Sequence, residues 1–195
     1  KEAEAILDKA GWKKGADGIR EKDGQKLQIL FPFITAKNND KSLAEYIQGE
    51  WKKIGVDVQL KGQEEKIHWE NAAKGNYDIM VNYTWGAPWD PHAFLQAMTV
   101  VSDNGGPDNA AQQGLPMKKE LDQRIEDLLV EADEDKMNED YAYVLKTLND
   151  QAVYIPISYQ ALTCVYRKAD LNDVEFMPEE NRLPVFTTSR ANGEK

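Results

Sequence analysis

The chain has 195 residues, of which 41% are hydrophobic, and a formal net charge of −10. This length and composition suffice for a folded domain with a sizeable core, which excludes a disordered chain. The negative charge argues against nucleic acids and anionic membrane surfaces as partners, and no apolar run reaches the ~20 residues that a membrane span needs. Because Lys1 is not an initiator residue, we expect that an upstream segment has been removed.

Short strands and amphipathic helices alternate through the first 85 residues. We expect a helix in "EAEAILDKAGW" that ends at Gly11, a turn-rich segment in "KKGADGIREKDGQ", and strands in "KLQILFPF" and "VDVQLK". The helix expected between these strands, "NNDKSLAEYIQGEWKKIG", has Ser42 and Glu45 at the spacing of a capping box and Gly55 at its end. Its predicted apolar face consists of Leu43, Tyr46, Ile47, Trp51 and Ile54.

A further helix and a third strand complete this pattern. The helix is expected in "EEKIHWENAAKG", ending at Gly75, and the strand in "YDIMVNYTW". The resulting β-α-β-α-β order implies right-handed crossovers and a largely parallel sheet, because parallel neighbours need a helix-length connection. The predicted fold class is therefore α/β.

The second half of the chain is predicted to be mainly helical. We expect a helix over residues 91–98, a loop over 99–116, and two longer helices joined by the acidic run "EADEDKMNED". That run lacks the glycine and the terminal glutamate of an EF-hand, so we interpret it as a solvated helix junction. "AVYIPISY" and "ALTCVYRK" are predicted to be buried extended segments, with Cys164 as a small buried residue, and the end of the chain to be frayed. The expected core residues of the two long helices are Leu121, Ile125, Leu128, Leu129, Tyr141, Val144, Leu145 and Leu148.

Two tryptophans in "TWGAPWDPHAFL", residues 84–95, mark the candidate site. Trp85 and Trp89 follow the predicted third strand directly, and open α/β sheets bind ligands beyond the carboxyl ends of their strands. Asp90 and Pro91 are typical of a helix start, whose free N–H groups suit an anionic or carboxylated ligand. The alternative is that the two indoles close the end of the core.

The residues point to binding rather than catalysis. His68 and His92 are the only histidines, and neither has further metal ligands at a suitable spacing. We find no glycine-rich phosphate loop, no metalloprotease helix motif and no Gly-x-Ser-x-Gly elbow. We therefore predict neither an enzyme nor a cofactor.

Several stretches resemble the extracytoplasmic solute-binding proteins of ABC importers that serve oligopeptides and nickel. They are "AILDKAGW", "GIREKDGQKLQILFPF", "AEYIQGEWKKIGVDVQL", "GNYDIMVNYTWGAPWDPHAFL" and "NDQAVYIPISY", while "TWGAPWDPHAFLQAM", "AQQGL" and "AVYIPISY" are most similar to the nickel-binding branch. The resemblance implies a two-lobed, hinged receptor with three-layer lobes of mixed sheet and flanking helices. Residues 1–164 would be the second lobe, residues 165–195 would normally return to the first lobe, and the amino-terminal lobe would be absent.

The resemblance also implies a ligand and its contacts. The expected ligand is nickel held by a small organic chelator, and the expected partner is a membrane permease in a periplasmic or extracytoplasmic location, with a lipid anchor in a Gram-positive cell. Asp103 matches a position where the family supplies a histidine to the metal, and Asp is a harder ligand than imidazole. The ligand-binding residues implied are Trp69, Trp85, Trp89 and Asn181, with Asp103 at the metal.

Three alternatives remain at this point. A peptide receptor of the same superfamily is the nearest, because such clefts hold peptide backbone as an added strand. A hydrolase that uses surface carboxylates is a second alternative, although no spacing supports it. A protein-interaction module, in which the aromatic side chains contact a partner, is the third.

Overall fold

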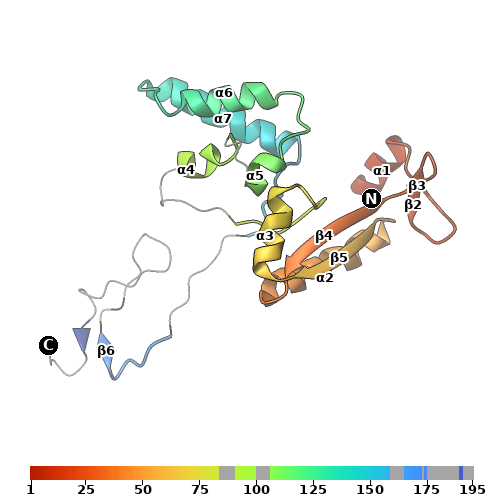
Figure 1. Cartoon of the computed structure of the whole chain (residues 1–195), viewed down its shortest axis with the longest axis horizontal. Coiled ribbons are helices and arrows are strands. Elements are labelled where there is room, and N and C mark those ends of the chain that lie inside the picture. The colour runs from red at the N-terminus through yellow and green to blue at the C-terminus, as the bar shows by residue number, and fades with distance from the viewer. Residues whose placement is uncertain (84–90, 100–105, 159–164, 173, 175–188, 191–195) are drawn as a thin grey trace. The chain divides into compact units, whose positions relative to one another are not determined.

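A computed structural model of the chain describes residues 1–83, 91–99, 106–158, 165–172, 174 and 189–190 (Figure 1). The described residues fall into two compact units, one with residues 1–83 and 106–114 and the other with residues 91–99 and from 115 onward. The described residues combine helices with parallel and antiparallel strand pairs, so the α/β prediction is confirmed. In chain order the elements are α1 (Glu2–Lys9), β1 (Lys13–Lys14), β2 (Arg20–Lys22), β3 (Gln25–Lys26), β4 (Gln28–Ile34), α2 (Asn38–Lys53), β5 (Asp57–Gln63), α3 (Glu65–Ala73), α4 (Pro91–Gln96), α5 (Pro107–Ala110), α6 (Lys118–Asp127), α7 (Glu134–Asp150), β6 (Leu171–Asn172) and β7 (Ser189–Arg190).

A two-stranded parallel sheet is the centre of the first unit. Strands β4 and β5 pair in register from Gln28 with Asp57 to Ile34 with Gln63, and α2 forms the crossover between them. The apolar side chains of β4 are buried or half-buried on both faces, as expected for a parallel strand. The buried core of this unit consists of Phe31, Ala44, Val56 and Val58.

Helix α2 corrects two predictions. It begins at Asn38, so Ser42 lies inside the helix and the predicted capping box does not form. Ala44, rather than Tyr46, is buried against the sheet, and Tyr46 is 66% exposed. The remaining apolar residues of the predicted face are half-buried, so the face is wrong only at Tyr46. The predicted end is confirmed, since Gly55 has a φ of 89°, which favours glycine.

The predicted third strand does not form among the described residues. Residues 76–83 instead run beside β4 without a regular ladder, and the backbone N–H groups of Asp78 and Ile79 both donate to the carbonyl oxygen of Leu30, at 3.0 and 3.3 Å. The Asp78 carboxylate accepts from the Leu30 N–H at 2.6 Å. Because a side chain takes the position of a backbone acceptor, the hydrogen-bond pattern of a strand pair is interrupted.

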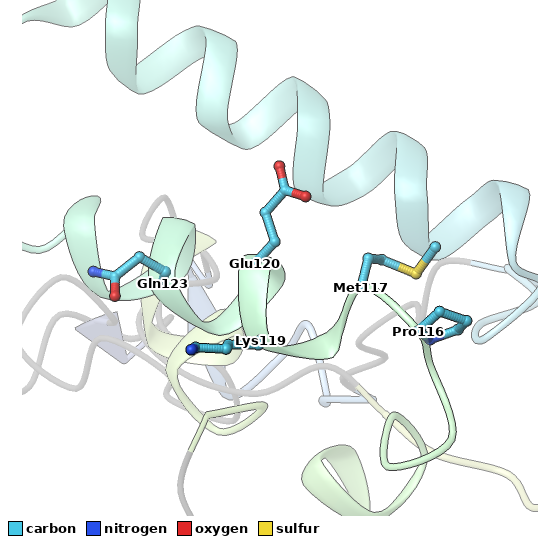
Figure 2. Close-up of a pocket in the computed structure, with 5 residues that line it drawn as sticks. All are labelled: Pro116, Met117, Lys119, Glu120 and Gln123. Atoms are coloured by element: carbon cyan, nitrogen blue, oxygen red, sulfur yellow. The ribbon is translucent and has the colours of Figure 1, made fainter.

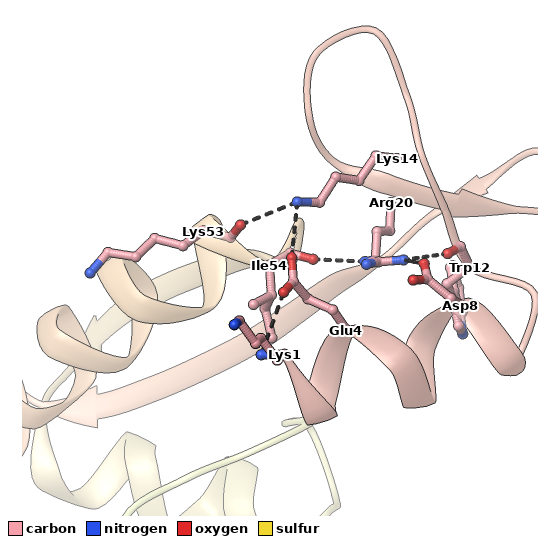
Figure 3. Close-up of polar contacts among 8 residues, drawn as sticks. All are labelled: Lys1, Glu4, Asp8, Trp12, Lys14, Arg20, Lys53 and Ile54. Atoms are coloured by element: carbon pink, nitrogen blue, oxygen red, sulfur yellow. Dashed lines mark hydrogen bonds and ion pairs between the residues drawn. The ribbon is translucent and has the colours of Figure 1, made fainter.

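The turn-rich segment after α1 forms a small antiparallel sheet, β1-β2-β3, that the sequence analysis did not predict. Arg20 on β2 is 2% exposed and connects this sheet to two helices (Figure 3). Its guanidinium donates to the carbonyl oxygens of Ile54 and Trp12, at 2.7 and 2.5 Å, and to the carboxylate of Asp8 at 2.5 Å. A buried arginine at the junction of α1, β2 and the end of α2 thus fixes the amino-terminal segment to the parallel sheet.

Helices α4, α6 and α7 form the second unit. Their predicted helical character is confirmed, and the side chain of Asp133 caps α7 by accepting from the N–H groups of Asp135 and Lys136 at 3.0 and 3.3 Å. The acidic run is therefore a helix junction, as predicted. The prediction that Leu129 and Leu145 belong to the core is wrong, since they are 55% and 58% exposed. The buried core consists of Leu95, Met98, Leu121, Ile125, Leu128, Val144 and Leu148.

Two extended segments differ from their prediction as buried strands. Ile155 and Ile157 are 56% and 61% exposed, and Val165 is 94% exposed. Near the carboxyl end, β6 pairs antiparallel with β7. Cys164 lies outside the described residues. In the part of the chain that the structure describes, no helix is both long enough and apolar enough to cross a bilayer.

Candidate functional site

The carboxyl ends of β4 and β5 lie side by side at one end of the parallel sheet, which we call the carboxyl edge. Ile34 and Gln63 form the last pair of the register, and the backbone N–H of Thr35 donates to the carbonyl oxygen of Gln63 at 2.9 Å. Helices α2 and α3 begin within four residues of this pair, at Asn38 and Glu65. Both strands point toward this edge in Figure 1. It is the type of edge at which open α/β sheets bind ligands.

Polar and aromatic side chains gather at this edge. We call them the carboxyl-edge cluster, which consists of Lys37, Asp40, Gln63, His68, Trp69 and Tyr83. Lys37 precedes α2, Asp40 lies in the first turn of α2, and Tyr83 comes from the segment after α3. Residues far apart in the sequence therefore meet where two strands end.

Asp40 and Tyr83 form the buried base of the cluster. Asp40 is 4% exposed, and the Tyr83 hydroxyl donates a short hydrogen bond to its Oδ1. Tyr83 as a whole residue remains 38% exposed, although its hydroxyl bonds to a buried carboxylate. Burial of the hydroxyl and its hydrogen bond to Asp40 raise the pKa of Tyr83 to about 12. Tyr83 therefore stays protonated and acts as a donor at neutral pH.

The ammonium group of Lys37 lies over two aromatic rings. Its Nζ is 5.2 Å from the ring centroid of Tyr83 and 5.9 Å from that of Trp69. Both distances are within the range of a cation–π contact. The distance from Lys37 Nζ to the Glu65 carboxylate is 3.9 Å, which is too long for a hydrogen bond.

His68 and Trp69 bring a buried imidazole and a half-buried indole to the cluster. His68 is 2% exposed, and its ring meets that of Trp69 edge to face at a centroid distance of 5.1 Å. Among the described residues, nothing hydrogen-bonds to Nδ1 of His68. Burial lowers the pKa of His68, despite the opposing charge of Asp40. The imidazole is therefore neutral at neutral pH.

A second set of polar contacts connects the segment after α3 with α5. Asn82 donates to Asp108 Oδ1 at 2.8 Å, and the Tyr77 hydroxyl donates to the carbonyl oxygen of Pro107 at 3.1 Å. Gln112, within the "AQQGL" motif, is fully buried and donates to the carbonyl oxygen of Asp108 at 3.1 Å. These contacts join both ends of the stretch 83–106, which contains Trp85, Trp89 and Asp103. Sequence analysis missed these contacts, since the Asn82–Asp108 and Tyr77–Pro107 pairs are separated by 26 and 30 positions.

The predicted site residues divide into one that is described and four that are not. Trp69, which the family resemblance suggested, lies on α3 at the carboxyl edge. Trp85, Trp89, Asp103 and Asn181 lie outside the described residues, and so does Asp90. Helix α4 begins at Pro91, as predicted. Sequence analysis missed the contributions of Lys37, Asp40 and Tyr83, and it treated His68 as an ordinary helix residue.

An open depression beside α6 does not have the features of a binding site. Its volume of about 590 Å³ would hold a small molecule, but residues of a single short segment line it (Figure 2). Glu120 points toward α7, and its carboxylate raises the pKa of Tyr143. The lining residues are Pro116, Met117, Lys119, Glu120 and Gln123. A site needs groups that converge from several elements, which the carboxyl edge provides.

The donor set for a metal is limited. Within the described ranges, no three His, Cys, Asp or Glu side chains come together in a way that would hold a metal ion. His68 contributes a buried imidazole and Asp40 a carboxylate that Tyr83 already engages. A metal bound at this edge would therefore take most of its ligands from elsewhere.

Comparisons with known proteins identify several relatives. Residues 1–106 match the family described as bacterial extracellular solute-binding proteins, family 5 Middle. The nickel-binding periplasmic protein of Escherichia coli is 41% identical over 183 residues, which cover 93% of this chain and 34% of that protein. The periplasmic oligopeptide-binding protein OppA of Salmonella typhimurium is 31% identical over 161 residues, or 76% of this chain and 28% of that protein.

Solved structures agree with these matches. The crystal structure of NikA from Brucella suis in complex with Fe(III)-EDTA superposes with a TM-score of 0.84 and 38% identity, over 96% of this chain and 37% of that one. The chain thus spans about a third of the length of the relatives it matches. The matched family and these relatives are binding proteins rather than enzymes, in agreement with the prediction from sequence.

Proposed function

Because this chain belongs to family 5 of the bacterial extracellular solute-binding proteins, we propose that it is part of the binding component of an ABC importer that captures nickel as a chelate. The observation that carries this proposal is the 41% identity to a nickel-binding periplasmic protein along 93% of the chain. The family, whose members are extracellular solute-binding proteins, supports a location outside the cytoplasm. A periplasmic location and, in a Gram-positive cell, a lipid anchor are parts of the proposal.

The carboxyl-edge cluster supports a chelate rather than a bare ion. The described residues gather aromatic faces and a cation there but no group of metal ligands. A small organic chelator would supply the ligands to nickel, and Trp69 would pack against the body of the chelator. Trp85 and Trp89 lie two and six positions after Tyr83 in the sequence, and we propose that they also contact the ligand. Asp103 is proposed to contact the metal and Asn181 the ligand.

The chain is proposed to be one lobe of a longer receptor. Its length, about a third of that of its relatives, supports this arrangement. Residues 1–164 would form the second lobe, residues 165–195 would return to the first lobe, and the ligand would be held between the lobes. Closure on the ligand would then present the receptor to a membrane permease.

The proposal is tested by ligand titration of the full-length receptor after removal of metal. Nickel chloride, nickel–histidine and nickel–citrate are titrated separately, with isothermal calorimetry and tryptophan fluorescence as readouts. We expect saturable binding of at least one chelate and weaker binding of nickel chloride. Heat and fluorescence that stay flat with both chelates would refute the nickel proposal.

A matched pair of variants connects the titration to this site. Trp69→Leu removes the half-buried indole, and we expect affinity for the chelate to fall about three- to tenfold. Tyr46→Leu removes an aromatic side chain of α2 that is 66% exposed and is not a member of the carboxyl-edge cluster, so affinity should stay within about twofold. An equal loss of affinity in both variants would show that the carboxyl edge is not part of the binding site.

Oligopeptides are the alternative ligands, because the chain is also 31% identical to an oligopeptide-binding protein. A peptide would bind along the cleft with its backbone as an added strand. Titration with di-, tri- and pentaalanine under the same conditions distinguishes the two. Binding of peptides in the absence of any response to nickel chelates would select the alternative.

A further inference from the structure

We infer that Lys37 determines specificity at the proposed site by pairing with a carboxylate of the chelator. This inference rests on the proposed function and specifies its ligand class: chelates that expose a carboxylate toward the carboxyl edge. It also assigns an anion contact to this lobe itself, at the residue that precedes the crossover helix α2.

The position of the Lys37 side chain is set by local structure. The residue follows the last β4–β5 pair by three positions, and its N–H donates to the carbonyl oxygen of Ile34 at 3.0 Å. Its extended backbone, with φ of −100° and ψ of 94°, ends the turn and starts α2. The turn thus carries the lysine across the end of the sheet, where its Nζ lies over the rings of Tyr83 and Trp69.

The charge of Lys37 is only weakly compensated by its neighbours. Glu65 is 3.9 Å away, and with side-chain exposures of 38% and 60% for Lys37 and Glu65 the pair is screened by solvent. The carboxylate of Asp40 is buried and engaged by the Tyr83 hydroxyl. The aromatic rings attract the ammonium group but accept no conventional hydrogen bond, so its N–H donors remain available to a ligand.

The surroundings make this cation suited to an organic anion rather than to a free inorganic one. Trp69 and Tyr83 offer apolar faces on which the carbon frame of a chelator packs, while Lys37 supplies the charge between them. Small chelators of nickel bind it through carboxylate oxygens, and a carboxylate keeps acceptor capacity for a lysine. A charge-assisted hydrogen bond of this kind changes affinity by about tenfold to hundredfold.

Three variants of the full-length receptor test the inference with whichever chelate, nickel–citrate or nickel–histidine, the wild type binds. Lys37→Met removes the charge and keeps the length of the side chain, and Lys37→Arg keeps the charge. Lys41→Met is the matched control: it removes a charge one turn later on the same helix, where Lys41 is 51% exposed and pairs with Glu45 at 3.8 Å. Affinity is measured by calorimetry at two salt concentrations, and thermal melting checks that each variant is folded.

We expect Lys37→Met to lose about tenfold to hundredfold in affinity and to show a weaker dependence on salt, whereas Lys37→Arg stays within about threefold and Lys41→Met within about twofold. Wild-type affinity in Lys37→Met, or an equal loss in Lys37→Arg, would overturn the inference while leaving the proposed function intact. A wild type that binds neither chelate would overturn both. These outcomes separate the role of Lys37 from the identity of the ligand.

Discussion

The hydroxyl of Tyr83 donates a hydrogen bond to the buried carboxylate of Asp40, 43 positions earlier in the chain. This bond joins the segment after α3 to the first turn of α2. It also fixes the residue that lies two positions before Trp85. The bond therefore serves both the stability of the first unit and the arrangement of its carboxyl edge.

Tyr83→Phe should destabilise the first unit. The substitution leaves the Asp40 carboxylate buried without its tyrosine donor, which costs about 1–3 kcal/mol in free energy of unfolding. Chemical denaturation measures this change. Tyr46→Phe, on an exposed tyrosine of α2, should change the same quantity by less than about 0.5 kcal/mol. Identical denaturation midpoints for the two variants would contradict the account of this bond.

His68 should make the first unit less stable in acid. Burial lowers its native pKa below the usual 6.5, so below pH 6.5 the unfolded chain binds more protons than the native chain. Stability is unaffected by this group above pH 6.5, falls as the pH drops through 6.5, and stops falling below the native pKa. Within that window the slope is at most about 1.4 kcal/mol per pH unit.

The measurement for His68 is a series of denaturation curves between pH 7.5 and pH 5, run on the wild type and on His68→Leu. The leucine variant lacks the titrating group and should show a flatter loss of stability. Carboxylates titrate mostly below this window and are common to both proteins. Parallel curves for the two proteins would mean that His68 is not kept neutral by burial.

Arg20 should be among the most sensitive positions of the first unit. Arg20→Ala removes three hydrogen bonds and leaves the carbonyl oxygens of Ile54 and Trp12 without this partner, at an expected cost of roughly 2–4 kcal/mol. Lys14→Ala, which breaks an exposed pair with Glu4 at 3.4 Å, should cost less than about 1 kcal/mol. Thermal melting of the two variants, compared with the wild type, checks this ranking. Equal melting temperatures would contradict it.

Two leucines of α7 test the core of the second unit. Leu148 is 4% exposed, and Leu148→Ala should lower the free energy of unfolding by about 2–5 kcal/mol because it leaves a cavity. Leu145, three positions earlier, is 58% exposed, so Leu145→Ala should change that energy by less than about 0.5 kcal/mol. The reverse order in urea denaturation would show that α7 presents a different face to its neighbours.

Local patterns predicted most elements of the fold because the relevant signals are short-range. The extended run at 26–33, the alternation in 56–61 and the glycines at 11, 55 and 75 correspond to the observed strands and helix ends. The pattern failed where a competing contact decides the outcome. The Asp78 carboxylate, rather than a backbone carbonyl, accepts the hydrogen bond of the Leu30 N–H, and this interrupts the expected third strand. Helix α2 begins a turn before Ser42, because its first turn is fixed by the end of β4 rather than by a cap.

The candidate site was predicted only in part. Its location beyond the carboxyl ends of the strands followed from the β-α-β order, and Trp69 from a family resemblance. The cluster around it depends on contacts such as Tyr83 with Asp40 and Lys37 with Trp69, which join residues far apart in the chain. No local motif encodes such pairs, so only the folded chain shows them. Lys37 in particular has no sequence signature beyond its place before a helix.

The central claim is that a nickel chelate binds at the carboxyl edge of β4 and β5. The most direct measurement is anomalous diffraction at the nickel absorption edge from crystals of the full-length receptor with its bound chelate. We predict one strong peak beside the carboxyl-edge cluster, with the chelator packed on Trp69 and one of its carboxylates at Lys37. A nickel peak remote from these residues, or peptide density in its place, would contradict the account.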